Sequence, residues 1–226
     1  MKKYKILTFG GAGGNIVRTL VSNNQFLYEK QGDILYHFNT DAQAIKNHKS
    51  LKNKYLIGNS GFVCPPSIEY AKILFDGDRK LFDELTNDDS PYLLIGAFSG
   101  YIGSVFLIKM SELLAKKRKK FVVVGSTPFR IEASERFQHS DDVIEILKDI
   151  TDNIIVLSCD KLQTSLGENI TVGTIFTMAD YYVIEAISSV LDLDNWSIDK
   201  QVRNILRNDD EISTAITKVR KYLNEN

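Results

Sequence analysis

Cysteine, net charge and long apolar runs are all scarce in this chain. Of its 226 residues only Cys64 and Cys159 are cysteines, and their separation fits no metal-ligand spacing. Neither a disulfide framework nor a zinc site is therefore predicted, and we expect no metal held by the protein alone. The formal net charge of −1 provides no global field that would favour nucleic acid or a membrane surface. The basic run at residues 116–120 ends a predicted helix, where positive charge complements the helix dipole.

The N-terminal segment has lysines but only a short apolar run, too short for a signal peptide or a membrane span. The chain has no internal repeat and no low-complexity segment. We therefore expect a cytoplasmic protein with no membrane segment and no nucleic-acid partner.

Apolar runs of strand length alternate with stretches of helical period. Strands are predicted at residues 5–9, 34–39, 55–57, 92–97, 121–125 and 153–158. Helices are predicted between them at residues 15–23, 67–85, 103–117 and 140–150. This alternation predicts an α/β fold, a three-layer Rossmann-like parallel sheet with helices on both faces. Ligands of such sheets bind over the carboxyl ends of the strands.

The last quarter of the chain is predicted to be helical. A long helix at residues 171–191 carries one apolar side, and two amphipathic helices follow at 197–207 and 211–224. We expect one domain over residues 1–191, which ends in the long helix, and a short helical appendage over residues 192–226.

The first strand is followed by a glycine-rich loop, residues 10–15 (GGAGGN), that opens a helix. Small residues in this position let backbone N–H groups approach a phosphate. A Walker A loop is excluded because no Gly-Lys-Ser/Thr follows. A dinucleotide fingerprint is disfavoured because Ile16 stands where a third small residue belongs. A tight turn without a ligand remains the alternative.

A second loop, residues 39–44 (NTDAQA), directly follows the second predicted strand. Together the two loops resemble FtsZ of the tubulin superfamily, in which a glycine-rich loop ending in Asn precedes the same NTDAQA segment. The resemblance continues through residues 127–129 with Glu132 and Arg136, and then through Phe176 with the Ala-Asp pair at residues 179–180.

The resemblance implies GTP or GDP as the ligand, with Mg²⁺ as an optional companion. The implied nucleotide-binding residues are Gly10, Gly11, Ala12, Gly13, Asn15, Asp41, Ser99, Gly100, Gly103, Ser104, Pro128, Glu132, Arg136, Phe176 and Asp180. A carboxylate at Asp180 accepts two hydrogen bonds from the guanine edge, and Phe176 lies one helical turn earlier to stack on the base. The alternatives are a core aromatic, a solvated acid, and an i,i+4 ion pair between Glu132 and Arg136.

The chain departs from the FtsZ pattern in the loop that wraps the phosphates. The family's GGGTGTG becomes residues 96–104 (GAFSGYIGS), in which Phe98, Tyr101 and Ile102 add bulk near the expected ligand. Ser99 and Ser104 still offer hydroxyl donors. Cys159 stands where the family has Asn, and a thiol donates only weakly.

The third departure concerns catalysis. In the family an Asn-x-Asp-x-x-Asp loop after the long helix enters the site of the neighbouring subunit and positions the attacking water. Here Asp192 replaces the Asn, Asp194 matches the middle acid and Ser197 replaces the last acid. Asp194 and Asp192 are the candidate catalytic residues, and Asp199 is a substitute after a shift; capping of the next helix by Asp194 or Ser197 is the alternative.

The family's second domain is expected to be absent, because two short helices cannot supply its sheet. The leading hypothesis is an FtsZ-like guanine-nucleotide-binding protein with weak or absent hydrolysis. It would act by homo-oligomerisation or by co-assembly with another FtsZ-like protein, in division or another cytoskeletal task. The alternative is a pseudo-GTPase without nucleotide that serves as an interaction scaffold, with Phe98, Tyr101 and Ile102 filling the pocket. A dinucleotide-binding oxidoreductase ranks third.

Overall fold

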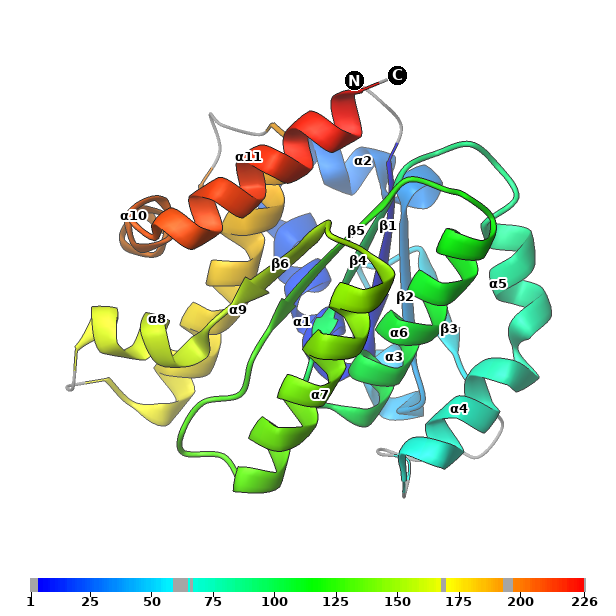
Figure 1. Cartoon of the computed structure of the whole chain (residues 1–226), viewed down its shortest axis with the longest axis horizontal. Helices are drawn as coiled ribbons and strands as arrows, with labels where there is room; N and C mark the ends of the chain where they lie inside the picture. Colours follow the sequence, from blue (N-terminus) through cyan, green and yellow to red (C-terminus); the bar gives the residue numbers. More distant parts are fainter. Residues whose placement is uncertain (1–3, 59–64, 66, 168–169, 193–196, 226) are drawn as a thin grey trace.

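The computed structural model describes residues 4–58, 65, 67–167, 170–192 and 197–225. Six strands form one parallel sheet in the order β3-β2-β1-β4-β5-β6 (Figure 1). The strands are β1 (Lys5–Phe9), β2 (Leu35–Asn39), β3 (Asn53–Leu56), β4 (Tyr92–Ala97), β5 (Phe121–Ser126) and β6 (Ile154–Leu157). The helices are α1 (Gly10–Asn23), α2 (Gln25–Ile34), α3 (Ala42–Asn47), α4 (Ile68–Gly77), α5 (Arg79–Leu85), α6 (Tyr101–Lys116), α7 (Ser134–Ile150), α8 (Cys159–Leu166), α9 (Val172–Val190), α10 (Lys200–Arg207) and α11 (Asp210–Asn224).

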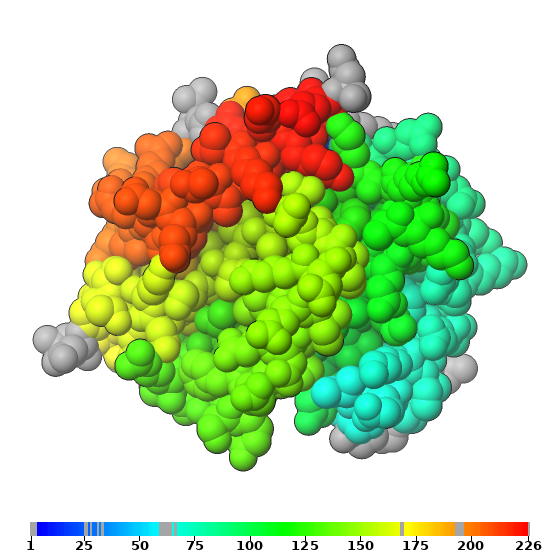
Figure 2. Space-filling view, in the orientation of Figure 1, coloured from blue at the N-terminus to red at the C-terminus, as the bar shows by residue number. Residues whose placement is uncertain are grey.

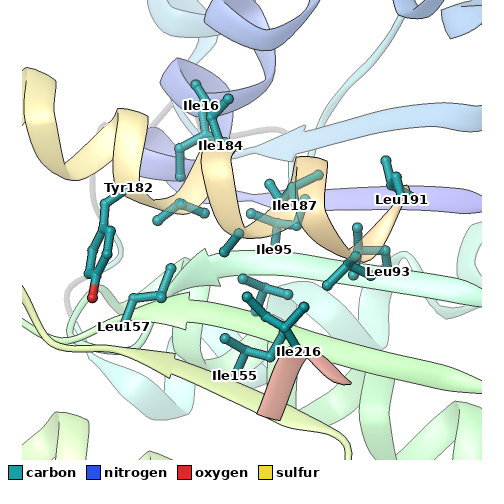
Figure 3. Packing of buried hydrophobic residues seen from close by; sticks show 14 of the residues in the cluster. Ile16, Leu93, Ile95, Ile155, Leu157, Tyr182, Ile184, Ile187, Leu191 and Ile216 are labelled. Carbon is teal, nitrogen blue, oxygen red and sulfur yellow. The ribbon is translucent and has the colours of Figure 1, made fainter. Parts of the chain in front are cut away.

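Helices cover both faces of the sheet. Successive strand residues point to opposite faces, so neighbouring residues of one strand pack against different helix layers. In β1, Ile6 belongs to a buried cluster with α1, α2, α9, α10 and α11, while the next residue, Leu7, belongs to a second cluster with α4, α5, α6 and α7. Figure 3 shows the first cluster, in which Ile184 and Ile187 of α9 pack toward Ile16 and the strand residue Ile95. The predicted three-layer α/β architecture is confirmed.

The helices of the structure differ from the predicted helices in three main ways. The helix predicted at residues 67–85 is divided into α4 and α5 at Asp78, whose backbone leaves the helical region at φ −99° and ψ 16°. Two helices begin about a turn or more earlier than predicted, α1 at Gly10 and α7 at Ser134. Three helices, α2, α3 and α8, were not predicted, since α3 and α8 are short and polar and α2 has only a weak apolar side.

The C-terminal helices α10 and α11 pack against the same cluster as α9. Val202 and Leu206 of α10 and Ile216 and Val219 of α11 are buried there beside Ile155 of β6. Figure 2 shows these two helices, orange to red, lying against α8 and β6. The division after residue 191 stays a prediction. Among the described residues, no helix is both long and apolar enough to cross a bilayer.

Candidate functional site

The loops that follow β1, β2, β4, β5 and β6 meet at one edge of the sheet, the lower edge in Figure 1. At its centre the first turns of α1 and α6 touch through glycines. Gly10 has φ +71°, and a β-carbon there would lie 3.2 Å from the backbone nitrogen of Gly103. A β-carbon on Gly103 would in turn lie 2.7 Å from the carbonyl oxygen of Ala97. These two glycines are therefore required for helix packing.

Other glycines of the same loops face open space. A β-carbon at Gly11 or at Gly100 would meet nothing within 4 Å. Neither α1 nor α6 has a side-chain cap or an acidic residue in its first turn, and the first N–H groups of a helix have no partner within the helix itself. Paired helix N-termini of this kind attract an anion.

The remaining predicted residues of the first loop differ in exposure. Asn15 is exposed and Ala12 is half-buried, so both lie at the surface of α1. Gly13 instead packs inward, because a β-carbon there would lie 3.3 Å from the carbonyl oxygen of Ile95.

The bulky residues of the diverged loop point in different directions. Phe98 is fully buried, and its Cζ occupies the space that a β-carbon at Gly125 would need, 2.5 Å away. Ile102 belongs to the same core cluster beneath α6. Tyr101 alone is exposed, and its ring packs edge-on against His139 at 5.8 Å. Two of the three bulky side chains thus lie in the core instead of the expected ligand position.

A recess of about 390 Å³ opens between the first turns of α4, α6 and α7. We call it the α6–α7 recess; Figure 2 shows the surface hollowed where the green start of α7 meets cyan α4. It is lined by Ile68, Ser99, Gly100, Tyr101, Glu135, Arg136 and His139. Ser104 lies next to it, fully buried, with its hydroxyl oxygen 2.8 Å from Nε2 of His139. Four predicted site residues, Ser99, Gly100, Ser104 and Arg136, are therefore brought together.

The second loop is held by its own side chains. Oδ1 of Asp41 accepts hydrogen bonds from the backbone of Gln43 at 2.8 Å and Ala44 at 3.0 Å, which caps α3. Asn39 is buried, and its side-chain oxygen accepts from the backbone of Thr40 at 2.8 Å. The buried hydroxyl of Thr40 has no hydrogen-bond partner in the described part of the chain.

Glu132 and Arg136 form the i,i+4 ion pair that the sequence left open, at 2.5 Å. The second carboxylate oxygen of Glu132 accepts from the backbone of Phe129 at 2.9 Å, which fixes the turn after the buried Pro128. Glu132 is mostly buried and Arg136 mostly exposed. The ion pair therefore holds the guanidinium of Arg136 in place beside the α6–α7 recess, which Arg136 lines.

Phe176 and Asp180 lie one turn apart near the start of α9. The ring of Phe176 is 45 % exposed and contacts Phe129 edge-on at 5.2 Å. Asp180 is half-buried, and no described residue donates a hydrogen bond to its carboxylate. Burial raises the pKa of Asp180 to about 6, and the positive charge of Arg18 on α1 offsets this only in part.

Cys159 lies beneath this region, not at its surface. It packs in a small buried cluster with Phe129 and Ile175. Burial, with a contribution from Glu132, raises the pKa of the thiol to about 12. Cys159 is therefore a neutral packing residue in this fold.

The acids after α9 have partners within the chain. Asp192 forms an ion pair with Arg220 of α11. Ser197 donates to Oε1 of Glu185 at 2.6 Å, and Asp199 caps α10 through the backbone of Val202 at 2.9 Å. Asp194 lies outside the described residues. No group of three or more metal-ligating side chains is found among the residues that the structure describes.

Comparison with known proteins agrees with this arrangement. Residues 3–167, more than half of the chain, match the model of the Tubulin/FtsZ family, GTPase domain. The chain belongs to the tubulin/FtsZ family. Among curated relatives, cell division protein FtsZ 1 of Thermococcus kodakarensis is 28 % identical over 197 residues, covering 84 % of this chain and 50 % of the relative. FtsZ of Neisseria meningitidis serogroup A is 25 % identical over 191 residues, covering 84 % and 47 %.

Solved structures of the tubulin/FtsZ family share the fold. An empty FtsZ dimer of M. jannaschii superposes with a TM-score of 0.73 at 23 % identity, covering 85 % of this chain and 55 % of that one. A GTPγS-bound protofilament of CetZ2 from Haloferax volcanii gives 0.68 at 16 % identity, covering 98 % and 64 %. The chain spans about half the length of the curated relatives it matches.

Three residues described above were not predicted from the sequence. His139 carries a detectable signal, since it lies three residues after Arg136 and so on nearly the same side of a helix. Arg18 and Glu185 carry none, because an isolated Arg or Glu in a helix is ordinarily solvated.

Proposed function

We propose that this chain binds a guanine nucleotide at the loop edge of its sheet and acts through nucleotide-linked assembly in the cytoplasm, in a cytoskeletal or division-related process. We further propose that it hydrolyses GTP weakly or not at all. The observation that supports the ligand best is the half-buried carboxylate of Asp180, which has a raised pKa and no donor from the described residues.

Guanine offers what this carboxylate needs. Its N1–H and N2–H₂ groups form a donor pair that adenine does not have. A partly desolvated carboxylate without donors is unfavourable, and a donor pair from a ligand relieves that cost. The exposed ring of Phe176, one turn earlier on the same face, is placed to stack on a purine held by Asp180.

The phosphates of the nucleotide would meet the other half of the site. The open backbone at Gly11 and Gly100, at two helix N-termini without caps, suits an anion. Arg136 adds a positive charge at the edge of the α6–α7 recess. Mg²⁺ accompanying a nucleotide keeps several waters and binds largely through the phosphates.

Weak hydrolysis is supported by the partners of the acids after α9. Hydrolysis in trans needs a carboxylate that is free to polarise water in a neighbouring subunit. The carboxylate of Asp192 pairs with Arg220, and that of Asp199 caps α10. Asp194 remains the proposed catalytic acid.

Titration calorimetry on nucleotide-free protein tests the ligand, with GTP, GDP and ATP compared in the presence of Mg²⁺. We expect guanine nucleotides to bind and ATP not to bind. Asp180→Asn should weaken guanine binding by about 1–3 kcal/mol, roughly 5- to 150-fold, because an amide cannot accept from both guanine donors. The control Asp149→Asn, an exposed acid on α7, should bind as the wild type does. Equal binding of ATP, or an unchanged Asp180→Asn variant, would refute the proposal.

A nucleotide-free interaction module is the second candidate. Val172 and Phe176, one turn apart on α9, are 60 % and 45 % exposed, and large exposed apolar side chains favour protein contacts. Absence of any bound or retained nucleotide would favour this scaffold.

If GTP is hydrolysed, turnover per subunit should rise with protein concentration, because the second half of the site would come from a neighbour.

A further inference from the structure

One hydrogen bond connects the loop after β4 to a helix far away in sequence. The hydroxyl oxygen of Ser104 lies 2.8 Å from Nε2 of His139, 35 residues later. Ser104 is fully buried in the first turns of α6, so the contact fixes the imidazole at the mouth of the α6–α7 recess. The ring also makes an edge-on contact with Tyr101.

The imidazole shares the lining of the recess with one cationic group. Arg136 lies three residues before His139 on α7, and both line the recess together with Ser99 and Gly100 at the start of α6. The ionisable neighbours from α7 are Glu135, Arg136 and Asp142, whereas α6 contributes Tyr101 and α4 contributes the apolar Ile68. The recess therefore brings the imidazole of His139 and the guanidinium of Arg136, both from α7, to the uncapped N-terminus of α6.

We propose that His139 is a specificity-determining residue that recognises the terminal phosphate of the nucleotide, taking up a proton when that phosphate enters the α6–α7 recess. The inference rests on the proposed function and deepens it. The loop after β4 has fewer glycines than the FtsZ pattern and so fewer positions where backbone N–H groups can approach a phosphate closely. The side chains of protonated His139, held by Ser104, and of Arg136 would supply hydrogen-bond donors in their place.

His139 takes up one proton when the terminal phosphate binds. In the empty site, burial lowers the pKa of His139 and Asp142 opposes this, so the ring is neutral at pH 7. On binding, the ring takes one proton from solvent, and no covalent bond is formed or broken. Both ring nitrogens then carry hydrogen, so Nε2 donates to Ser104 and Nδ1 is available to a phosphate oxygen. The phosphate charge raises the pKa of the bound imidazole.

This arrangement predicts pH-dependent selectivity for GTP over GDP. As pH falls from 8 to 6, the ratio of the two affinities should move toward GTP, since only the longer nucleotide places its last phosphate in the recess. Asp180 and the phosphate itself also titrate near this range, and their effects are shared by variants at position 139. The difference between wild type and His139→Gln therefore isolates the imidazole.

The experiment measures Kd for GDP and for a non-hydrolysable GTP analogue at pH 6, 7 and 8. In the wild type, relative to His139→Gln, we expect the selectivity ratio to rise about tenfold toward pH 6, the change that corresponds to about one unit of pKa shift. Glutamine keeps a hydrogen-bonding group for Ser104 but cannot be protonated. The control Glu145→Gln, an exposed position on the same helix, should follow the wild type.

A second measurement does not depend on affinity. The chain has three histidines, and His37 and His48 are buried with lowered pKa values. NMR titration of the imidazole signals should show the pKa of His139 rising when the GTP analogue is added, and rising less with GDP.

The outcomes separate the two proposals. Guanine binding with the same pH profile in wild type and His139→Gln, or an unshifted His139 signal, overturns the role of His139 and leaves the proposed function intact. Absence of guanine binding at every pH overturns both.

Discussion

Arg220 on α11 forms an ion pair with Asp192, the acid just after α9. Asp192 has φ +61°, a left-handed conformation that Asp and Asn tolerate better than other non-glycine residues. The pair ties the end of the long helix to the last helix of the chain, so this acid has a stabilising role within its own subunit.

Asp192→Asn keeps the left-handed conformation and removes the charge. We expect the free energy of unfolding to fall by less than about 1 kcal/mol, because both partners are partly exposed. GTP turnover, where detectable, should be unchanged in this variant and should fall in Asp194→Asn. Urea denaturation and a phosphate-release assay check the two parts. A loss of turnover in Asp192→Asn would instead assign Asp192 a catalytic role.

Glu185 is a buried acid that anchors the segment after α9. It is fully buried, and its Oε1 accepts from Ser197 Oγ at 2.6 Å and from the backbones of Ile198 and Asp199 at 2.7 and 3.2 Å. Glu185→Ala should lower the free energy of unfolding by about 3 kcal/mol or more, since three donors lose their acceptor. Glu185→Gln keeps one acceptor oxygen and should cost less. Equal stability of the two variants by urea denaturation would contradict this account.

Phe98 and Tyr101 should respond differently to truncation. Phe98→Ala removes a fully buried ring and should destabilise the fold by about 3–5 kcal/mol. Tyr101→Ala removes an exposed ring and should cost much less. Thermal unfolding of both variants measures the difference. A stable Phe98→Ala protein with improved nucleotide affinity would show that the ring obstructs the ligand.

His37 makes stability depend on pH. Its ring is fully buried against Thr8, and burial, with His48 contributing, lowers its pKa from 6.5 to about 3. Unfolding therefore takes up a proton between these values, so stability is complete above pH 6.5 and is lost as pH falls. The loss at pH 5 should be about 2 kcal/mol. Urea titrations at pH 7 and 5 should show a smaller loss in His37→Asn; an equal loss would assign the effect elsewhere.

The sequence was informative where signals are local. The strand at Lys5–Phe9 and the loop opening with Gly10 could be predicted, because an apolar run and a glycine cluster are visible in adjacent residues. The alternation of strands and helices then determined the sheet architecture. The i,i+4 spacing of Glu132 and Arg136 allowed an ion pair as the alternative to ligand contacts, and the structure shows that pair.

The features that the sequence did not predict depend on contacts between segments far apart in the chain. The bond between Ser104 and His139 joins residues 35 positions apart, so no spacing rule reveals it. The inward direction of Phe98 depends on the space left by Gly125 on the neighbouring strand. Glu185 lies among apolar neighbours in α9, and its carboxylate gains partners from residues 197–199 and from Arg203 of α10, which are distant in sequence.

The glycine contact between α1 and α6 sets how closely the two helices approach each other. Because Gly10 meets the backbone of Gly103 without an intervening side chain, the separation of the two helix starts depends on main-chain atoms alone. Phe98 and Ile102, which precede Gly103, are buried in the core, and Tyr101 is exposed. If the chain binds a nucleotide as proposed, this contact keeps the two helix N-termini adjacent, so one bound phosphate chain would meet the N–H groups of both helices.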